Sequence, residues 1–208
     1  MAGIPGQGRK FDIDQALDIA MEQFWTHGYE GTSVSTLTAA MGISPPSLYA
    51  AFGGKRQLFD RVVDHYLGGK GAWMDRAFEE ETSTVALVRR LLAEAAVNYA
   101  DPAQPGGCLV ITAGTMVTDA NADIAEALRL QRNNNIDRLE MALRSGDLPS
   151  GIDPRAAAEF LGVAIQGMST RARDGASVDQ LLAAGDLVLR SLGVSPSGEQ
   201  LIGSRDTH

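Results

Sequence analysis

The chain has 208 residues, of which 44% are hydrophobic, and a formal net charge of −8. This length is enough for a small domain and a larger one, each with its own core. The single cysteine excludes a disulfide within the chain, and the three histidines are too scattered for the ligand spacing of a zinc site. No apolar run is long enough to span a bilayer and no leader segment is recognisable, so we expect a cytoplasmic protein without membrane contact, metal or cofactor.

The charge is unevenly distributed along the chain. Residues 1–70 carry six of the 18 lysines and arginines and seven of the 26 acidic residues, so this segment is almost neutral and most of the acidity lies beyond it. Arg9 and Lys10 precede the first predicted helix as a short basic arm. Lys55 and Arg56 stand at the start of another helix, where free N–H groups also favour an anion.

A first amphipathic helix is predicted over residues 11–24, with its end at Gly28. Residues 32–52 then indicate two short helices joined by a tight turn. Hydroxyl side chains before each helix can cap it, Gly42 ends the first helix, and Ser44 followed by proline begins the second. This is a helix pair that fits a DNA groove about 12 Å wide.

The segments ALDIAMEQFWTHGYEGTSV, MGISPPSLY and AFGGKRQLF lie between Ile13 and Phe59. They resemble the DNA-binding domain of the TetR family of transcriptional regulators, because several residue types recur at fixed offsets on three successive helices. The resemblance covers about the first sixty residues. It implies a helix-turn-helix head whose last short helix enters the major groove.

The resemblance also implies roles for individual side chains. Phosphate contacts would come from Tyr49, Lys55 and Thr32. The base-reading surface departs from the family's commoner pattern, because Ala50 and Ala51 stand where a bulky polar or aromatic residue is frequent. Without Arg, Asn or Gln on this helix, specificity is expected from serines, apolar contacts with thymine methyl groups and DNA shape. The complete predicted DNA-binding set is Arg9, Lys10, Thr32, Ser33, Ser44, Pro45, Pro46, Ser47, Tyr49, Ala50 and Lys55.

The rest of the chain keeps a helical pattern. A fourth helix from Lys55 is interrupted by glycines at 68–71, and its apolar residues continue over 73–78. Further helices are predicted over 84–99, 108–117, 121–145, 154–173 and 177–192. The pattern predicts an all-α fold of about nine helices. Its parts would be a helix-turn-helix DNA-binding domain at 1–54, an effector-binding and dimerisation domain at 55–193, and a disordered tail at 194–208.

By the same resemblance, an effector pocket lies among the middle helices. A mostly apolar lining favours a small hydrophobic effector, while ordinary core packing is the alternative for each residue. The predicted lining residues are Trp73, Met74, Phe78, Tyr99, Met116, Leu128, Gln131, Phe160 and Met168.

The last two predicted helices carry small and apolar residues on more than one face. A partner helix explains the second face best, and the resemblance implies a homodimer joined by a four-helix bundle. Packing against the chain's own core is the alternative. The predicted interface residues are Ala157, Phe160, Ala164, Gly167, Leu181, Ala184, Leu187 and Val188.

The resemblance implies a regulator, usually a repressor, that binds double-stranded DNA at a palindromic operator. An effector that favours a shifted fourth helix would change the distance between the two heads and release the DNA. Two alternatives stay open: a helix-turn-helix protein that has lost operator binding, and a regulator that senses oxidation at Cys108. No nucleophile elbow, phosphate-binding glycine loop or metal motif supports an enzyme.

Overall fold

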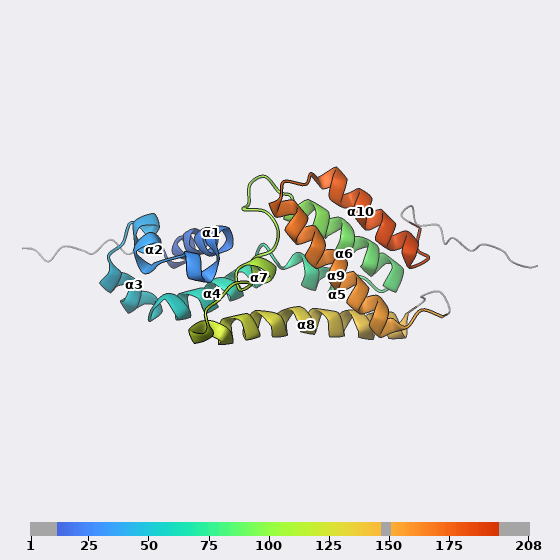
Figure 1. Cartoon of the computed structure of the whole chain (residues 1–208), viewed down its shortest axis with the longest axis horizontal. Helices are drawn as coiled ribbons and strands as arrows, with labels where there is room; N and C mark the ends of the chain where they lie inside the picture. The colour runs from blue at the N-terminus through green and yellow to red at the C-terminus, as the bar shows by residue number, and fades with distance from the viewer. Residues whose placement is uncertain (1–11, 147–150, 196–208) are drawn as a thin grey trace, which may run out of the picture.

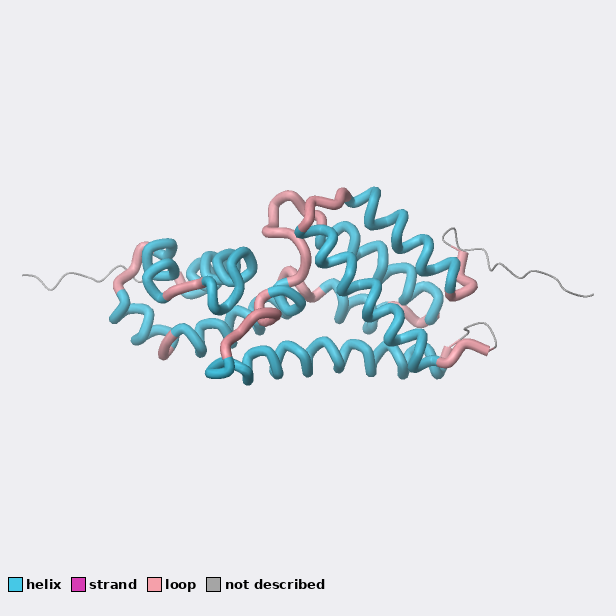
Figure 2. The backbone as a smooth tube through the Cα atoms, in the orientation of Figure 1, coloured by secondary structure: helices cyan, strands magenta, loops and turns pink. Residues whose placement is uncertain are grey.

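The computed structural model describes residues 12–146 and 151–195 as an elongated, all-helical molecule (Figure 1). Ten α-helices and one 3-10 turn make up its regular structure, and this described part contains no strand, as Figure 2 shows. A small head of three helices lies at one end and a body of longer helices at the other. The predicted all-α fold class is therefore confirmed. None of the described helices has both the length and the apolarity of a membrane span.

The head consists of α1 (Ile13–Gly31), α2 (Val34–Met41) and α3 (Pro45–Phe52). Each helix follows a side chain that accepts a hydrogen bond from a backbone N–H of the first turn: Asp12, Ser33 and Ser44. Gly42 ends α2 in the left-handed conformation, with φ 67°, which glycine adopts at little cost. The local sequence therefore determines the turn between the two short helices.

The helix α1 differs from its predicted extent at both ends. It begins at Ile13, because the side chain of Asp12 caps it by accepting from the N–H of Asp14 at 2.9 Å. It extends to Gly31 instead of ending at Gly28, which is the one non-helical residue inside it, with φ 72° and ψ 174°. The aromatic side chain that follows this break, Tyr29, is buried.

The fourth helix, α4 (Lys55–Gly68), belongs to the core of the head and also leads into the body. The ring of Phe59 lies edge-on to those of Phe24 and Tyr29, with centroid distances of 5.0 and 5.1 Å. Leu58 beside it has no exposed surface. The domain boundary predicted after residue 54 stays a prediction, and α4 shares its first half with the head.

A tight turn separates α4 from α5 (Trp73–Glu80). The carbonyl of Tyr66 accepts hydrogen bonds from the N–H groups of Gly69 at 3.2 Å and Gly71 at 2.7 Å. A Cβ at position 71 would lie 2.7 Å from the Tyr66 ring, so this return of the chain requires glycine there. The glycine cluster thus ends one helix and permits a new one, which raises the helix number to ten.

The body contains α6 (Thr84–Tyr99), α7 (Leu109–Thr112), the 3-10 turn η1 (Asp119–Asn121), α8 (Ala122–Ser145), α9 (Pro154–Arg173) and α10 (Val178–Ser191). The long helix α8 runs along one side, with α6, α9 and α10 across from it and α7 next to the head (Figure 1). The predicted helix over 108–117 was wrong in extent, because only four residues are helical. Gly114 lies so close to α8 that a Cβ would be 2.5 Å from a methyl group of Leu128, so packing on α8 sets the chain path there.

The predicted tail begins with ordered packing. Val194 and Ser195 are both buried, the N–H of Val194 donates to the carbonyl of Leu189 at 2.9 Å, and Arg89 donates to the carbonyl of Ser195 at 3.0 Å. The prediction of disorder was therefore wrong for these two residues. The remainder of the predicted tail, 196–208, lies outside the described residues.

The end of α1 is attached to the loop between α7 and α8. The N–H of Tyr29 donates to the carbonyl of Ala113 at 3.0 Å. One carboxylate oxygen of Glu30 accepts from the N–H and hydroxyl of Thr118, at 2.8 and 2.7 Å, and from the side-chain amide of Asn121 at 2.9 Å. These hydrogen bonds lower the pKa of Glu30 to about 2, and the one from the Thr118 N–H has the largest effect.

Two arginines and a tryptophan extend this joint between head and body. Arg173 of α9 donates to the carbonyl of Trp25 at 2.8 Å, and the indole N–H of Trp25 donates to the carbonyl of Gly106 at 3.1 Å. Arg56, near the start of α4, forms an ion pair with Asp123 at the start of α8. Both α1 and α4 are thus bound to the body by polar contacts.

The substitution Glu30→Gln tests the joint through the pH dependence of stability. The folded pKa of Glu30 is about 2 against an ordinary value of 4.5, so the unfolded chain binds this proton more tightly. The carboxylate therefore stabilises the fold above about pH 4.5, and this contribution is lost as the pH falls toward 2. We expect urea midpoints of the wild type to exceed those of the variant near neutral pH and the difference to shrink in acid.

The matched control is Glu79→Gln, which changes an exposed glutamate of α5 that makes no hydrogen bond or ion pair within the described residues. It should show no such pH-dependent difference. A Glu30→Gln difference that stays constant from neutral pH down to about pH 3 would contradict the assigned role of the carboxylate.

Candidate nucleic-acid interface and internal cavity

The outer face of α3 is small, uncharged and accessible. Leu48 and Phe52 bury the other face of the helix, with 0% and 5% exposure. The residues of the predicted base-reading set are Ser44, Pro45, Pro46 and Ala50, which are exposed, and Ser47, which is half-buried. The two serine hydroxyls lie 2.9 Å apart, and that of Ser44 also accepts from the N–H of Ser47. The structure therefore brings these five predicted residues together on one narrow surface.

Tyr49 and Lys55 lie at the end of this surface nearest α4. Tyr49 is 53% exposed, and a Cβ on Gly54 would be 3.6 Å from its ring. The ammonium of Lys55 lies 3.9 Å from the centroid of the Tyr29 ring. Burial lowers the pKa of Lys55, and the charge of Glu30 opposes this shift. Since α4 has no side-chain cap, its first-turn N–H groups add positive potential beside this ammonium.

Four other predicted DNA contacts remain. Thr32 is fully buried, and its hydroxyl donates to the carbonyls of Gly28 at 2.8 Å and Gln23 at 3.2 Å. A phosphate contact by this side chain was therefore a wrong prediction, because the hydroxyl stabilises the end of α1. Ser33 is exposed and caps α2. Arg9 and Lys10 lie outside the described residues.

A cavity of about 70 Å³ lies inside the body, bounded by α4 to α9. Its walls include five of the predicted lining residues, which are Trp73, Met74, Phe78, Tyr99 and Gln131. They also include residues that the sequence analysis did not place there, among them Tyr66, Cys108, Arg132, Asn135 and Gln166. Gln131, Arg132 and Asn135 lie on one face of α8, and their spacing was visible in the sequence. The same spacing is typical of a solvent-exposed helix face, so the sequence alone did not point to a cavity.

Four predicted lining residues are absent from the cavity wall. Met116 is 86% exposed on the loop after α7, and Phe160 is 41% exposed on the outside of α9. Leu128 is buried against Gly114, and Met168 is buried elsewhere along α9. Apolar character alone does not tell which side of a helix a residue occupies, and this is why the prediction failed for them.

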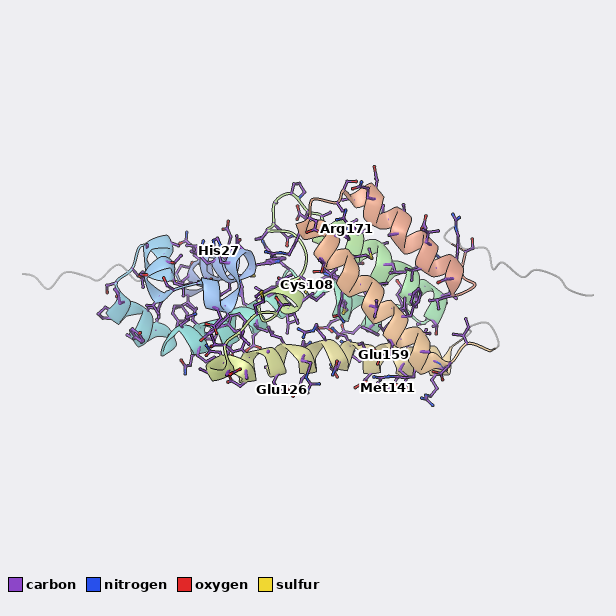
Figure 3. The ribbon with its side chains drawn as sticks, in the orientation of Figure 1. His27, Cys108, Glu126, Met141, Glu159 and Arg171 are labelled. Carbon is purple, nitrogen blue, oxygen red and sulfur yellow. The ribbon has the colours of Figure 1, made fainter. Side chains whose placement is uncertain are left out.

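Cys108 lies at the centre of the molecule, where α7 begins (Figure 3). The thiol is buried and accepts a hydrogen bond from the hydroxyl of Tyr66 at 3.3 Å. Burial raises the pKa of Cys108, and the Tyr66 hydrogen bond opposes this shift only in part. The protonated thiol is a poor nucleophile and a poor target for oxidants, which gives no support to a redox sensor. No group of three His, Cys, Asp or Glu side chains among the described residues could hold a metal ion.

An apolar face on α9 and α10 is exposed. Leu187 and Val163 are 66% and 69% exposed, and Phe160 is 41% exposed. The predicted residues Gly167 and Ala184 are also exposed, and Ala164 and Val188 are half-buried. Two predicted interface residues, Ala157 and Leu181, are each only 3% exposed and pack in the chain's own core, so their assignment to a partner surface was wrong.

Comparisons with known proteins agree with this arrangement. The family model described as bacterial regulatory proteins, tetR family, matches residues 16–62. The chain is 36% identical to the HTH-type transcriptional repressor ComR of Escherichia coli K12, over 89% of this chain and 90% of that protein. It is 32% identical to the HTH-type transcriptional repressor BdcR of the same organism, over 86% and 88%.

Solved structures give the same result. Two cysteine-substituted forms of the TetR family transcriptional regulator CifR, each complexed with a 26-base-pair operator DNA, are 36% identical to this chain. Their TM-scores are 0.82 and 0.84, with coverage of 89% and 90% of this chain and 99% and 100% of those chains. On its fold and on relatives matched over most of its length, the chain belongs to the TetR family of bacterial transcriptional regulators.

Proposed function

We propose that this chain is a transcriptional repressor that binds a palindromic operator as a homodimer and is released by a small effector. The observation that carries the proposal is the exposed, capped helix α3, held by buried Leu48 and Phe52 at the end of the molecule. The operator-bound CifR structures, with their TM-scores above 0.8, support a DNA-binding role for this head. The proposed site of action is the cytoplasm, where operator DNA lies, and no catalytic reaction is assigned to the chain.

In this proposal α3 enters the major groove. Ser44 and Ser47 offer hydroxyl groups to base edges, and Ala50 and Pro46 offer apolar contacts to thymine methyl groups. Tyr49 and Lys55 bind backbone phosphates and so fix the position of the helix without reading sequence. Because α3 has no long polar side chain, much of the specificity comes from DNA shape.

The acidity of the chain does not oppose this docking. Salt screens the charges of the distant part of the body over about 8 Å at physiological ionic strength. The body carboxylate of Asp123, which reaches the start of α4, is neutralised by its ion pair with Arg56. On the head, Arg56 is already paired with Asp60 and Asp123. Of the other described cations of the head, Arg61 donates to the carbonyl of Ala51, whereas Lys55 stands beside the free N–H groups at the start of α4. We therefore expect Lys55 to contact a DNA phosphate.

The proposed dimer uses the exposed face of α9 and α10. A second copy packing the same face against it would form a four-helix bundle and cover Phe160, Val163 and Leu187. The dimer would direct two heads toward half-sites about 34–36 Å apart. The C-terminal end of α4 lines the cavity in the body, and its N-terminal half packs in the core of the head. A ligand that moves α4 in the cavity would therefore also move the head.

The first test is mapping of genomic fragments that the purified protein retains. We expect a palindromic motif with half-sites one helical turn apart, including fragments close to the regulated genes. Purified protein with a deletion of residues 44–52 serves as the control for non-specific retention. Enrichment that is no greater than for this control would refute operator binding and favour a protein that has lost it.

The substitution Lys55→Gln tests the phosphate contact on the operator found in this way. Each phosphate contact contributes about 0.9 to the slope of log affinity against log salt, so we expect the slope to fall by about that amount for each head. The matched control is Lys70→Gln, an exposed lysine beyond α4. Since the Lys55 ammonium also contacts Tyr29, thermal unfolding of the variant is measured beside its binding. An unchanged salt slope would remove Lys55 from the DNA contacts.

The substitution Leu187→Asp tests the dimer face. Met141→Asp is a matched control, because both side chains are 66% exposed and Met141 lies on the outer side of α8 (Figure 3). A buried, unpaired carboxylate in an apolar interface is strongly unfavourable, so we expect Leu187→Asp to be monomeric by analytical ultracentrifugation and to lose most operator affinity. A dimeric Leu187→Asp with normal operator affinity would place the interface elsewhere.

A further inference from the structure

The body cavity contains an unusual charged group. Two charged residues line it, Asp75 and Arg132. Asp75 forms an ion pair with Arg138 on α8. Arg132 has no carboxylate within ion-pair distance in the described part of the chain, whereas Arg129, Arg138 and Arg144 of the same helix each have one. The cavity therefore holds a positive charge that the protein itself does not neutralise.

The guanidinium of Arg132 is also partly withdrawn from solvent. It is half-buried, and burial is the main cause that lowers its pKa. Its one hydrogen bond within the described residues is from Nη1 to the carbonyl of Val110, at 2.9 Å. A neutral carbonyl satisfies one of five N–H donors and does not balance the charge. Such a group gains from an anion that can accept two parallel hydrogen bonds.

Neutral polar side chains surround this charge. Gln131 and Asn135 lie next to Arg132 and one turn away on α8, and Gln166 lies across from them on α9. None of the three amides makes a hydrogen bond within the described part of the chain. Their N–H groups are donors that can complete the coordination of an anion. The other walls are apolar, as Trp73 and Phe78 illustrate.

The size of the cavity limits its occupant. Its volume is about 70 Å³. A cavity of roughly 150 Å³ accommodates the six carbon atoms of benzene, so this one has room for roughly three or four non-hydrogen atoms. A two-carbon carboxylate is close to this size, with a head for Arg132 and a methyl group for the aromatic wall, and a longer chain would have to extend toward the open side of the cavity.

We propose that the effector of this regulator is a small aliphatic monocarboxylate, bound in the cavity by Arg132 and the amides of Gln131, Asn135 and Gln166. This inference rests on the proposed function for its regulatory meaning, but the binding site itself does not depend on DNA.

The same arginine connects the ligand to the head. Two parallel hydrogen bonds to a carboxylate fix the plane of the Arg132 guanidinium, and the same guanidinium also donates to the carbonyl of Val110, which belongs to α7. Directly after α7, the carbonyl of Ala113 accepts the hydrogen bond from Tyr29 at the end of α1. A reorientation of Arg132 on ligand binding is therefore transmitted through Val110 to the segment to which the head is attached. Ligand binding would in this way favour a head position that no longer fits the operator.

The test measures binding of acetate, propionate and butyrate to the full-length protein without DNA, in a carboxylate-free buffer, beside acetamide, propionamide and butyramide. Isothermal calorimetry and thermal unfolding report the binding, since a ligand specific to the folded state raises the unfolding temperature. We expect at least one carboxylate to bind about tenfold or more tightly than its amide, because a charge-assisted pair is replaced by a neutral one.

Two variants complete the test. Arg132→Gln should lose this preference for the carboxylate, whereas Arg129→Gln, which changes an exposed arginine paired with Glu126, should keep it. Thermal unfolding without ligand shows whether Arg132→Gln is folded, and Arg132→Lys provides a second variant that keeps the charge and should retain part of the preference. Equal binding of carboxylates and amides, no binding of any carboxylate, or full preference in folded Arg132→Gln would each overturn the proposal.

Operator binding is then measured with and without the carboxylate that binds. A carboxylate that binds and lowers operator affinity supports the whole inference. If it binds without changing operator affinity, the anion site stands and its role as the effector site is refuted. A protein that binds no DNA at all would refute the proposed function, while the calorimetric result would still decide whether the anion site exists.

Discussion

The attachment of the α1 end to the loop after α7 is the constraint on which the rest of the structure depends. The backbone hydrogen bond from Tyr29 to Ala113 and the three hydrogen bonds to Glu30 hold the head against the body. The Glu30 carboxylate is surrounded by donors, so its charged form is strongly favoured. These are directional contacts at fixed distances, so a displacement of the loop must either move the head or break them.

The cavity and the head share their supporting elements. Tyr66 of α4 lines the cavity and donates to Cys108, while Phe59, about two turns earlier, packs in the head core. Helix α7 lines the cavity on one side and is followed by the attachment point of α1 on the other. Two physical connections, one through a continuous helix and one through a short loop, therefore run from the same space to the DNA-binding surface. Coupling between the sites requires only that a ligand prefer one arrangement of these elements.

The charge distribution is compatible with this division of roles. Most arginines of the body are paired with carboxylates on the same or a neighbouring helix, as in the group formed by Arg155 with Asp137, Glu140 and Glu159. Exposed pairs of this kind contribute little to stability, typically about 0 to 1 kcal/mol each. Arg132 differs from the other cations of the body by its place in the cavity wall, and Lys55 differs from those of the head by its place beside the free N–H groups at the start of α4.

Sequence signals predicted what depends on neighbouring residues. Ser33, Gly42 and Ser44 act as caps and breaks within a few residues of their own position, so the two short helices and their turn follow from local hydrogen bonding and backbone preference. The spacing of apolar residues likewise predicted α6, α8, α9 and α10 within a residue or two of their observed ends. The DNA-binding role of the head was inferred from the resemblance to a known family, because residue spacing alone predicts helices and not their function.

Tertiary structure decided what depends on residues distant in sequence. In the sequence Thr32 looks like an exposed helix cap. In the fold it is buried, and its hydroxyl donates to the carbonyls of Gln23 and Gly28. Arg132 looks like one more charged residue of a surface helix, and only the packing of α7 and α9 against α8 places it in the wall of a cavity, with no carboxylate within ion-pair distance. The physical reason is the same in both cases: short-range periodicity tells which side of a helix a residue occupies, whereas burial and partners depend on which other element covers that side.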